Sequence, residues 1–406
     1  MRILHVTPYS DQTWAYGGIP RVVGTLASTQ VRHGHHVTIC ATDAYDEFTR
    51  LSSPVRRSRY HPWPPIERPD GVVLRIFPNL SNRAAYAAQM FLPIGMRRFF
   101  ERQVDEFDVA HVHACRNVPG LLAERSLGRA RVPFVLAPNG TAPIIERRRG
   151  AKRLFDALVG KRIIASASRV LAVSRAEVGQ LVEAGAVADT IRLVPNPVNL
   201  AEFTPPVPRG QLRRRLALGD VPLVVFLGQL TPRKHVNVLV EAFARMKEPA
   251  CLAIVGNDMG AESAARSLVK RLGLGARVVF VGLLTGRDRL EALADADVVV
   301  YASEHEVFGL VPLEALLVGT PVIVADDSGC GELIRSVGGG VVVPVGRVEP
   351  LASAVDGVLR SVGQWRLIAA EAGVRVRAAF GEESVCRRLE RVYEEAISGH
   401  AAERVA

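Results

Sequence analysis

Residues 298–325 read VVVYASEHEVFGLVPLEALLVGTPVIVA, and the order of apolar and polar residues in this segment indicates the type of fold. Its apolar, β-branched beginning ends near Ala302 and is typical of a strand buried on both faces of a sheet. A polar loop follows, and Pro312 stands where a helix can begin, because the first helical turn needs no N–H group from a proline. Gly319 and Pro321 end that helix, and a second apolar run follows. The pattern predicts a strand–loop–helix–strand unit of a parallel sheet.

Two carboxylates flank the expected ligand-binding end of this unit. Glu306 lies in the loop and Glu314 in the expected first helical turn, with the backbone amides of Phe308, Gly309 and Leu310 between them. Parallel sheets bind ligands beyond the carboxyl ends of their strands, against helix N-termini. Either glutamate alone could be a solvated charge or a complement to the helix dipole. The pair favours binding, with one carboxylate on sugar hydroxyls, the other on a ribose, and a phosphate on the amides.

The same segment, EVFGLVPLEALLVGTPVIVAD, places seven residues between Glu306 and Glu314. It resembles the Glu-x7-Glu signature of family 4 glycosyltransferases, which are retaining enzymes. The resemblance implies the GT-B fold, an α/β fold of two Rossmann-like doubly wound domains with an interdomain cleft and a C-terminal helix that crosses back to the first domain. It also implies that Val307 and its neighbours up to Leu310 bind the donor. The resemblance is strong from 220 to 335 and looser before 200.

Strands and helices alternate along the chain, as in doubly wound parallel sheets, with helices of the first half expected near 17–33, 84–106, 118–128, 150–167 and 175–184. Residues 195–210, PNPVNLAEFTPPVPRG, are rich in proline and predict a stiff linker. We therefore expect an acceptor-side domain (1–196), a nucleotide-sugar domain (197–375) and a C-terminal helix (376–406) that packs on the first domain. Residues 44–71 predict a long loop. The expected strands are 3–7, 37–41, 72–77, 109–112, 134–137, 170–173, 223–227, 251–255, 278–281, 298–302, 322–325 and 340–344.

The run FLGQLTPRK, from Phe226 to Lys234, ends the first expected strand of the second domain and leads into a helix. It resembles the family segment in which an arginine and a lysine hold the donor diphosphate. Lys234 matches, but Gln229 stands at the arginine position and His235 at a glycine position. Because glutamine carries no charge, one charge-assisted contact is missing, and Arg233 is the candidate to replace it.

Glycines mark further donor contacts. Gly17 and Gly18 lie between the first strand and the first helix, where backbone amides can approach a phosphate. A Gly-Gly pair alone is more often only a turn, but YGGIPRVV resembles the N-terminal loop of the family and favours donor binding. The resemblance also places Gly256 and Asn257 beneath the nucleotide and the base against the backbone of Val281.

Alternating His111, His113 and Cys115 end another predicted strand and should face one way. Histidine and cysteine are zinc ligands, but no fourth ligand is evident nearby. The family has a histidine near the donor sugar at the position of His113, so we expect His113 to orient the transferred sugar beside Glu306 and Lys234 as catalytic residues. Asn139 and Thr141, after the next strand, are candidate acceptor contacts, although the family often has a histidine where Asn139 stands.

Composition places these motifs in a soluble globular protein of 406 residues, 48% hydrophobic and 23% charged. No apolar run is long enough for a membrane span, no signal peptide is evident, and five scattered cysteines suggest reduced thiols in the cytoplasm. Residues 1–200 carry 27 Lys and Arg against 16 Asp and Glu, most densely at 97–98 and 147–162. This excess suits an anionic membrane surface at the inner face of the cell membrane, or reflects arginines on solvated faces.

Together these features predict a retaining glycosyltransferase that moves a hexosyl unit from a UDP- or GDP-linked sugar to a glycan. We favour a lipid-linked acceptor, as in polysaccharide assembly. The alternatives are a soluble acceptor, or a nucleotide-sugar-binding protein without turnover. The nucleotide sugar is a substrate, and we expect neither a cofactor, a metal nor a nucleic-acid partner.

Overall fold

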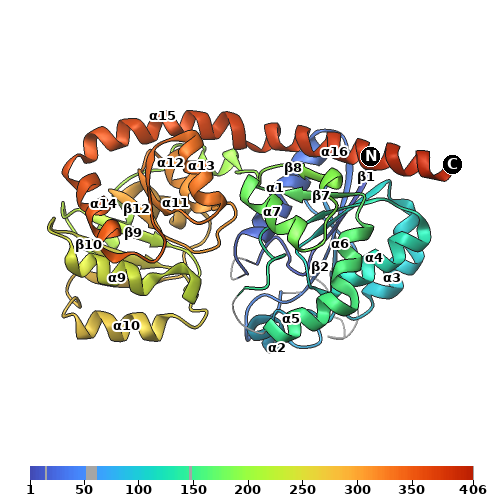
Figure 1. The fold of residues 1–406 in the computed structure, drawn as a ribbon, viewed down its shortest axis with the longest axis horizontal. Helices are drawn as coiled ribbons and strands as arrows, with labels where there is room; N and C mark the ends of the chain where they lie inside the picture. The colour runs from blue at the N-terminus through green and yellow to red at the C-terminus, as the bar shows by residue number, and fades with distance from the viewer. Residues whose placement is uncertain (14–15, 52–61, 146–148, 406) are drawn as a thin grey trace. The chain divides into compact units, whose positions relative to one another are not determined.

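The computed structural model describes residues 1–13, 16–51, 62–145 and 149–405. It divides into two compact units, Met1–Pro197 with Glu382–Ala406, and Val198–Gly381. Each unit holds one mainly parallel sheet with helices on both faces (Figure 1). The doubly wound architecture predicted from the sequence is therefore confirmed. The second unit ends at Gly381 rather than at the expected residue 375, because its last helix continues to Phe380.

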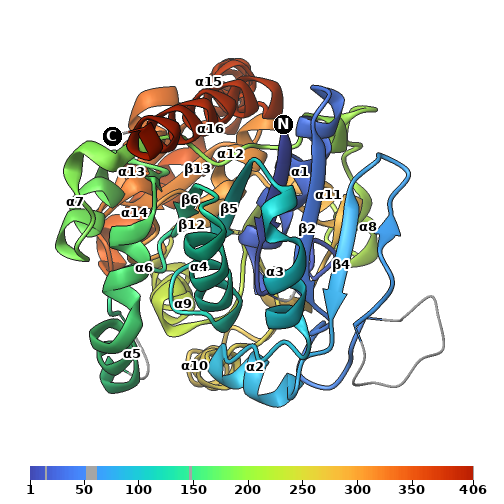
Figure 2. The same ribbon diagram turned by 90° about the vertical axis from the view of Figure 1, so that its right-hand side faces the viewer.

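The first sheet has the strand order β3-β4-β2-β1-β5-β6-β7-β8 among the described residues, with β3 antiparallel to β4 and the other pairs parallel. Figure 2 labels β4, β2, β5 and β6 in this order across the unit, and β1 pairs with β2 on one side and β5 on the other. The strands are β1 Arg2–Val6, β2 His36–Thr42, β3 Ile66–Glu67, β4 Val73–Phe77, β5 Val109–His113, β6 Phe134–Ala137, β7 Arg169–Ala172 and β8 Ile191–Leu193. β3 and β8 were not predicted from the sequence, because they are too short to give an apolar run. Part of the predicted loop 44–71 lies outside the described residues.

The helices of this unit fall where expected, with one difference. The single helix expected near 84–106 is broken, because Gln89 ends α2 in a left-handed conformation and Gly95 (φ 84°) precedes α3. The elements are α1 Gly18–Arg32, α2 Asn82–Ala88, α3 Met96–Gln103, α4 Val118–Ala130, α5 Arg149–Phe155, a π-helical segment Asp156–Gly160, α6 Lys161–Ser166, α7 Arg175–Glu183 and α16 Glu382–Val405.

Alternation along β5 separates an apolar face from a polar one. Ala110 and Val112 join the core formed with α3, α4 and α6. His111 and His113 lie on the opposite face, which α1 and α16 cover. The sheet therefore keeps buried histidines beneath two helices that are far apart in the sequence.

The helix α16 belongs to the first unit although it follows the second in the chain. Its Tyr393 is fully buried, and its apolar stripe packs inward. Figures 1 and 2 show the helix running along the first unit. Ion pairs hold one edge, where Glu383 contacts Arg32 at 2.9 Å and His33 contacts Glu390 at 2.7 Å. The described chain thus returns to the first sheet after completing the second.

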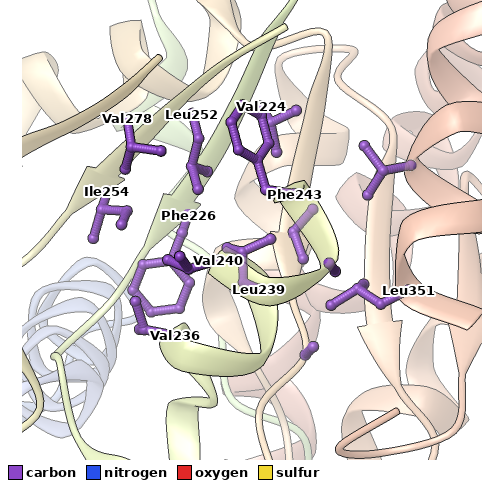
Figure 3. Packing of buried hydrophobic residues seen from close by; sticks show 14 of the residues in the cluster. Val224, Phe226, Val236, Leu239, Val240, Phe243, Leu252, Ile254, Val278 and Leu351 are labelled. Carbon is purple, nitrogen blue, oxygen red and sulfur yellow. The ribbon is translucent and has the colours of Figure 1, made fainter. Parts of the chain in front are cut away.

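The second sheet has the order β11-β10-β9-β12-β13-β14 and is parallel throughout. A core of Val, Leu, Ile and Phe side chains fills the space between this sheet and α9 (Figure 3). The strands are β9 Leu223–Leu227, β10 Cys251–Val255, β11 Val278–Gly282, β12 Val298–Tyr301, β13 Val322–Ala325 and β14 Gly340–Val343. The helices are α8 Gln211–Arg215, α9 Val236–Arg245, α10 Glu262–Arg271, α11 Gly286–Asp295, α12 Leu310–Leu317, α13 Gly329–Val337, α14 Val348–Arg360 and α15 Val362–Phe380.

Candidate active site

The loop between β12 and α12 holds Glu306 at the carboxyl edge of the second sheet, as the sequence predicted. The start of α13 fixes this loop, because the carbonyl of Glu306 accepts from Ser328 Oγ (2.7 Å) and from the amide of Cys330 (2.9 Å). Gly309 (φ 79°) caps α12, and a Cβ added there would lie 2.7 Å from Cys330 Sγ. The loop therefore requires glycine at this position.

Two cationic side chains and two hydroxyl groups surround the carboxylate of Glu306. Its Oε2 contacts Lys234 Nζ, accepts from Tyr301 (3.0 Å) and Ser303 (3.3 Å), and lies 3.8 Å from Arg233 Nη1. Burial alone would raise the pKa of Glu306, but Lys234 and then Arg233 outweigh it and lower the pKa to about 2. Glu306 is therefore ionised at neutral pH.

A tight turn places the two cations. Pro232–Lys234 forms one 3-10 turn, and His235 ends it in the left-handed region (φ 53°), which is the conformation that glycine adopts easily. This accounts for the family glycine that His235 replaces. The Lys234 side chain is only 6% exposed and lies 4.4 Å from the centre of the Tyr301 ring. Sequence reasoning missed Tyr301, although it ends the apolar run of a central strand.

Glu314 differs from its expected setting. It lies beyond the first turn of α12, is fully buried, and its Oε2 is 2.9 Å from Nη1 of Arg289 on α11. Arg289 is itself 2% exposed and also pairs with Glu202. The expected position of Glu314 in the first helical turn is therefore wrong, and a buried cation balances its charge. Contact of Glu314 with a ribose stays a prediction.

The side chains of Val307 and Phe308 face the core rather than the loop surface. They are 5% and 2% exposed, and Phe308 packs edge-on against Phe380. Donor contacts by these residues must therefore come from the backbone. The amides of Phe308, Gly309 and Leu310 stand at the beginning of α12, where N–H groups have no acceptor within the helix.

The other predicted donor contacts of the second unit lie near the carboxyl ends of β9, β10 and β11. The amide of Gly256 donates to the carbonyl of Gly282 (2.9 Å), and a Cβ at Gly256 would collide with the carbonyl of Gly228. Gly256 thus allows the ends of β9 and β10 to approach, and its amide already has a partner; its place beneath the nucleotide stays a prediction. Val281 is the extra residue of a β-bulge, because pairing with β10 passes from Phe280 to Gly282. Gln229 and Asn257 lie at the same sheet edge, with their carbonyls bound to nearby amides.

The first unit presents its own candidates at the carboxyl edge of its sheet. Gly17 (φ 92°) caps α1 in a conformation that favours glycine, and Gly18 is exposed. Asn139 (φ 52°) is half-buried, and its Oδ1 has no hydrogen-bond partner among the described residues. The Thr141 hydroxyl instead serves its own turn, since it accepts from the amide of Cys115 (2.8 Å) and donates to Pro138 (2.6 Å). The structure therefore favours Asn139 over Thr141 as a ligand contact.

His113 belongs to a buried group of three imidazoles. β1 and β5 pair His5 with His111, and His113 Nε2 lies 2.9 Å from His5 Nδ1. Burial, followed by repulsion from neighbouring rings, lowers the pKa of His111 and His113 well below the usual value. Cys115 lies outside the group because Ala114 (φ 62°) interrupts the alternation. Sequence reasoning missed His5, whose place beside His111 depends on strand register.

The three rings could hold a metal ion by distance, since one ligand atom of each lies within 4.8 Å of the others. Their hydrogen bonds argue against this use, because His5, Gln30 and Tyr393 engage four of the six ring nitrogens. Asp295 and Asp297 have the spacing of a metal-binding Asp-x-Asp pair, but they bind backbone amides and arginines instead. The described residues thus fit a metal poorly at both places.

Two glycosyltransferase family models match the chain, one in each half. Residues 16–202 match the model of Glycosyltransferase Family 4, and residues 209–366 match the model of glycosyl transferases group 1. HepE of Anabaena, solved with UDP and glucose, superposes with a TM-score of 0.75 at 20% identity over 97% of this chain and 99% of that one. The two units thus form the GT-B fold of a glycosyltransferase.

Sequence relatives place the chain within that class. A GDP-mannose-dependent alpha-mannosyltransferase of Mycobacterium tuberculosis is 30% identical over 328 residues, 78% of each chain. A D-inositol 3-phosphate glycosyltransferase of Xylanimonas cellulosilytica is 35% identical over 240 residues, 56% of this chain and 55% of that enzyme. The chain therefore belongs to the family 4 type of glycosyltransferases, which use nucleotide-sugar donors.

Proposed function

We propose that this protein transfers a hexosyl unit from a UDP- or GDP-linked sugar to a glycan acceptor with retention at the anomeric carbon. The observation that carries the proposal is the convergence of Lys234 and Arg233 on Glu306. Two cations beside the amides of a helix N-terminus suit a diphosphate, and the neighbouring carboxylate suits sugar hydroxyls. The names of the relatives, one GDP-mannose-dependent and one solved with UDP and glucose, agree with this donor class.

The proposed chemistry is electrostatic and needs no metal. Lys234 and Arg233 stabilise the negative charge that develops on the departing diphosphate, and this lowers the barrier to cleavage of the glycosidic bond. The acceptor hydroxyl attacks the same face of the sugar and passes its proton to a phosphate oxygen. In the ligand-free protein, the Glu306 carboxylate balances the positive charges of Lys234 and Arg233. When the donor binds, its diphosphate contacts these two cations instead. Glu314 binds the ribose in this proposal, with Arg289 as its second partner.

Arg233 supplies the charge that Gln229 lacks. Its side chain is 28% exposed, and its Nη1 lies 3.8 Å from Glu306 Oε2, so it reaches the group that Lys234 already contacts. This makes turnover a better proposal than binding alone, because the site keeps two cations. A charge-assisted contact of this kind contributes roughly 1.5–3 kcal/mol.

For the acceptor we propose a molecule with an anionic and an apolar part, as a lipid-linked glycan has. The first unit contains a cavity of about 490 Å³ whose walls combine Ile144 and Ile145 with Arg153 and Lys161. Of its two acidic wall residues, Asp156 and Glu183, the first is paired with Arg116. The membrane contact expected at 97–100 has less support, because Phe100 is fully buried and Phe99 packs against the same core. Residues 146–148 of the second basic cluster lie outside the described residues. No described helix is long and apolar enough to cross a membrane.

The first test of this function is thermal stabilisation by UDP, GDP and ADP. A ligand at 100 times its Kd should add about 2.7 kcal/mol to the stability of the wild type. Lys234→Met should abolish this gain, while His305→Asn, a change in the exposed part of the same loop, should preserve it. Glu314→Ala is a poor probe, because it would leave Arg289 without one of its carboxylates. No stabilisation of the wild type by any nucleotide would contradict the donor site.

Turnover and acceptor class need separate measurements. Release of the nucleoside diphosphate from UDP-glucose or GDP-mannose should require a glycan acceptor, whereas a binding protein would release none. Sedimentation with anionic liposomes at low and high salt tests the lipid-linked acceptor. Binding that salt does not weaken, or no binding at all, would favour a soluble acceptor.

A further inference from the structure

Hydrogen bonds fix the protonation of the three buried histidines one after another. His5 Nε2 lies 2.7 Å from the carbonyl oxygen Oε1 of Gln30, so this nitrogen carries the proton and donates it. A neutral His5 then has a bare Nδ1. His113 Nε2, 2.9 Å from that nitrogen, must carry the proton between them. It follows that Nδ1 of His113 is bare and can only accept.

A second branch fixes His111. The amide nitrogen of Gln30 donates to the hydroxyl oxygen of Tyr393 (3.2 Å), and that hydroxyl lies 2.7 Å from Nδ1 of His111. Tyr393 therefore donates its own proton to His111 Nδ1, which leaves the ring proton on His111 Nε2. Gln30 thus controls both branches through the two ends of one amide group.

Each branch ends in a buried atom with no partner among the described residues. These atoms are His111 Nε2 and His113 Nδ1, and both residues line a cavity of about 20 Å³. Asn139, whose Oδ1 also has no described partner, lines the same cavity. An unpaired buried polar atom costs roughly 1–3 kcal/mol, so the two ring nitrogens, on residues that line one space, point to a missing ligand group. A sugar hydroxyl has one proton for the two acceptors, whereas a water molecule could also donate to Asn139 Oδ1.

We propose that this cavity is a hydroxyl-binding pocket in which the hydroxyl donates to His113 Nδ1 and accepts from His111 Nε2–H. A hydroxyl both donates and accepts, as one bare and one protonated nitrogen require. About 20 Å³ holds one such oxygen and excludes a larger group. His5, Gln30 and Tyr393 act as positioning residues, since they set the ring protons without contacting the hydroxyl.

Two sources can supply this hydroxyl, a bound water molecule or a sugar substrate. The second source rests on the proposed function and gives His113 a defined role as an acceptor toward the transferred sugar. A cation fits less well, because the proton on His111 Nε2 would face it. Burial keeps both rings neutral at physiological pH, so their tautomers persist over the working range.

The test is ¹⁵N NMR of the full chain labelled at histidine, which separates protonated from bare ring nitrogens. At pH 7 we expect a proton on Nε2 and a bare Nδ1 for His113. A proton on Nδ1 of His113 in the free wild type would overturn the proposal. Gln30→Met should mix the tautomers of His113. Tyr393→Phe is the matched control, because it should mix the tautomers of His111 and leave the tautomer of His113 unchanged. An unchanged His113 in Gln30→Met would refute the relay.

Addition of UDP-glucose, GDP-mannose, UDP or GDP then identifies the hydroxyl. A shift of the His113 Nδ1 resonance with a nucleotide sugar, but not with the diphosphate alone, assigns the pocket to a sugar hydroxyl. A hydrogen-bonded resonance in every sample assigns it to water. If His113 Nδ1 shows the resonance of a nitrogen without a hydrogen bond in every sample, the proposed hydroxyl-binding pocket is wrong. Because the tautomers are measured without ligand, failure of the proposed function is distinguishable from failure of this inference.

Discussion

Replacement of Lys234 by methionine tests the electrostatics of the site most directly. Methionine keeps the apolar stem of the side chain and removes the charge beside Glu306. The pKa of Glu306 falls from its ordinary 4.5 to about 2 in the folded protein, which corresponds to about 3 kcal/mol of stability. Without Lys234 the carboxylate stays buried with Arg233 at 3.8 Å as its remaining cation. Burial lowers the pKa of Lys234, so removing its charge recovers part of this energy, and we therefore expect Lys234→Met to destabilise the second unit by at most about 3 kcal/mol at pH 7.

A double-mutant cycle isolates the interaction. In a Glu306→Gln background the same lysine substitution should cost far less, which gives a coupling energy of about 2–3 kcal/mol. Hydrogen exchange of peptides from β9 and β12 reports the opening of this unit within the full chain. Because the folded pKa is depressed, the stabilisation exists above pH 4.5 and is lost as the pH falls toward 2. A coupling below about 0.5 kcal/mol at pH 7, or one already halved at pH 5.5, would refute the reasoning.

Three further outcomes follow from buried or constrained groups. Arg289→Met should cost roughly 3–5 kcal/mol, measured by urea unfolding, because it leaves Glu314 charged in the core; a loss below 1 kcal/mol would contradict the ion pair. Gly309→Ala should lower the melting temperature and weaken nucleotide stabilisation, since its Cβ would meet Cys330; unchanged values of both would argue against a rigid loop. Burial opposes charge on His33, but two glutamates of α16 raise its pKa above 6.5. The stability that this ion pair gives to the packing of α16 should therefore be fully present below pH 6.5 and be lost as the pH rises through the raised pKa. Hydrogen exchange of α16 should show this pH dependence in the wild type but not in His33→Gln.

The sequence was sufficient for the strands of the second unit. The predicted limits of β9, β10 and β13 match the structure, because these strands are buried on both faces and therefore read as continuous apolar runs. The loop with Glu306 and the turn with Lys234 could be placed for the same reason, since each follows such a strand. The break between α2 and α3 was missed, because apolar residues continue through it.

Side-chain partners were harder to predict than their positions. Glu314 was expected to face a ligand, yet its partner Arg289 lies on another helix, and the packing of α11 against α12 decides their contact. His5 joined the histidines only through the register of β1 and β5. One sequence shows which residues end strands, but it does not show which strands are neighbours. The contacts that set charge and tautomer in this protein depend on that second kind of information.

The return of α16 to the first sheet has a consequence for biosynthesis. As the chain leaves the ribosome, Gln30 and His111 emerge early, whereas Tyr393 emerges only after the whole of Val198–Gly381. The nascent first unit must therefore wait, with an apolar groove and its histidines open, while the second unit is synthesised and can fold as a unit of its own. The unit that begins the chain is thus the last to be completed, and the buried histidine site matures only when translation has passed both sheets.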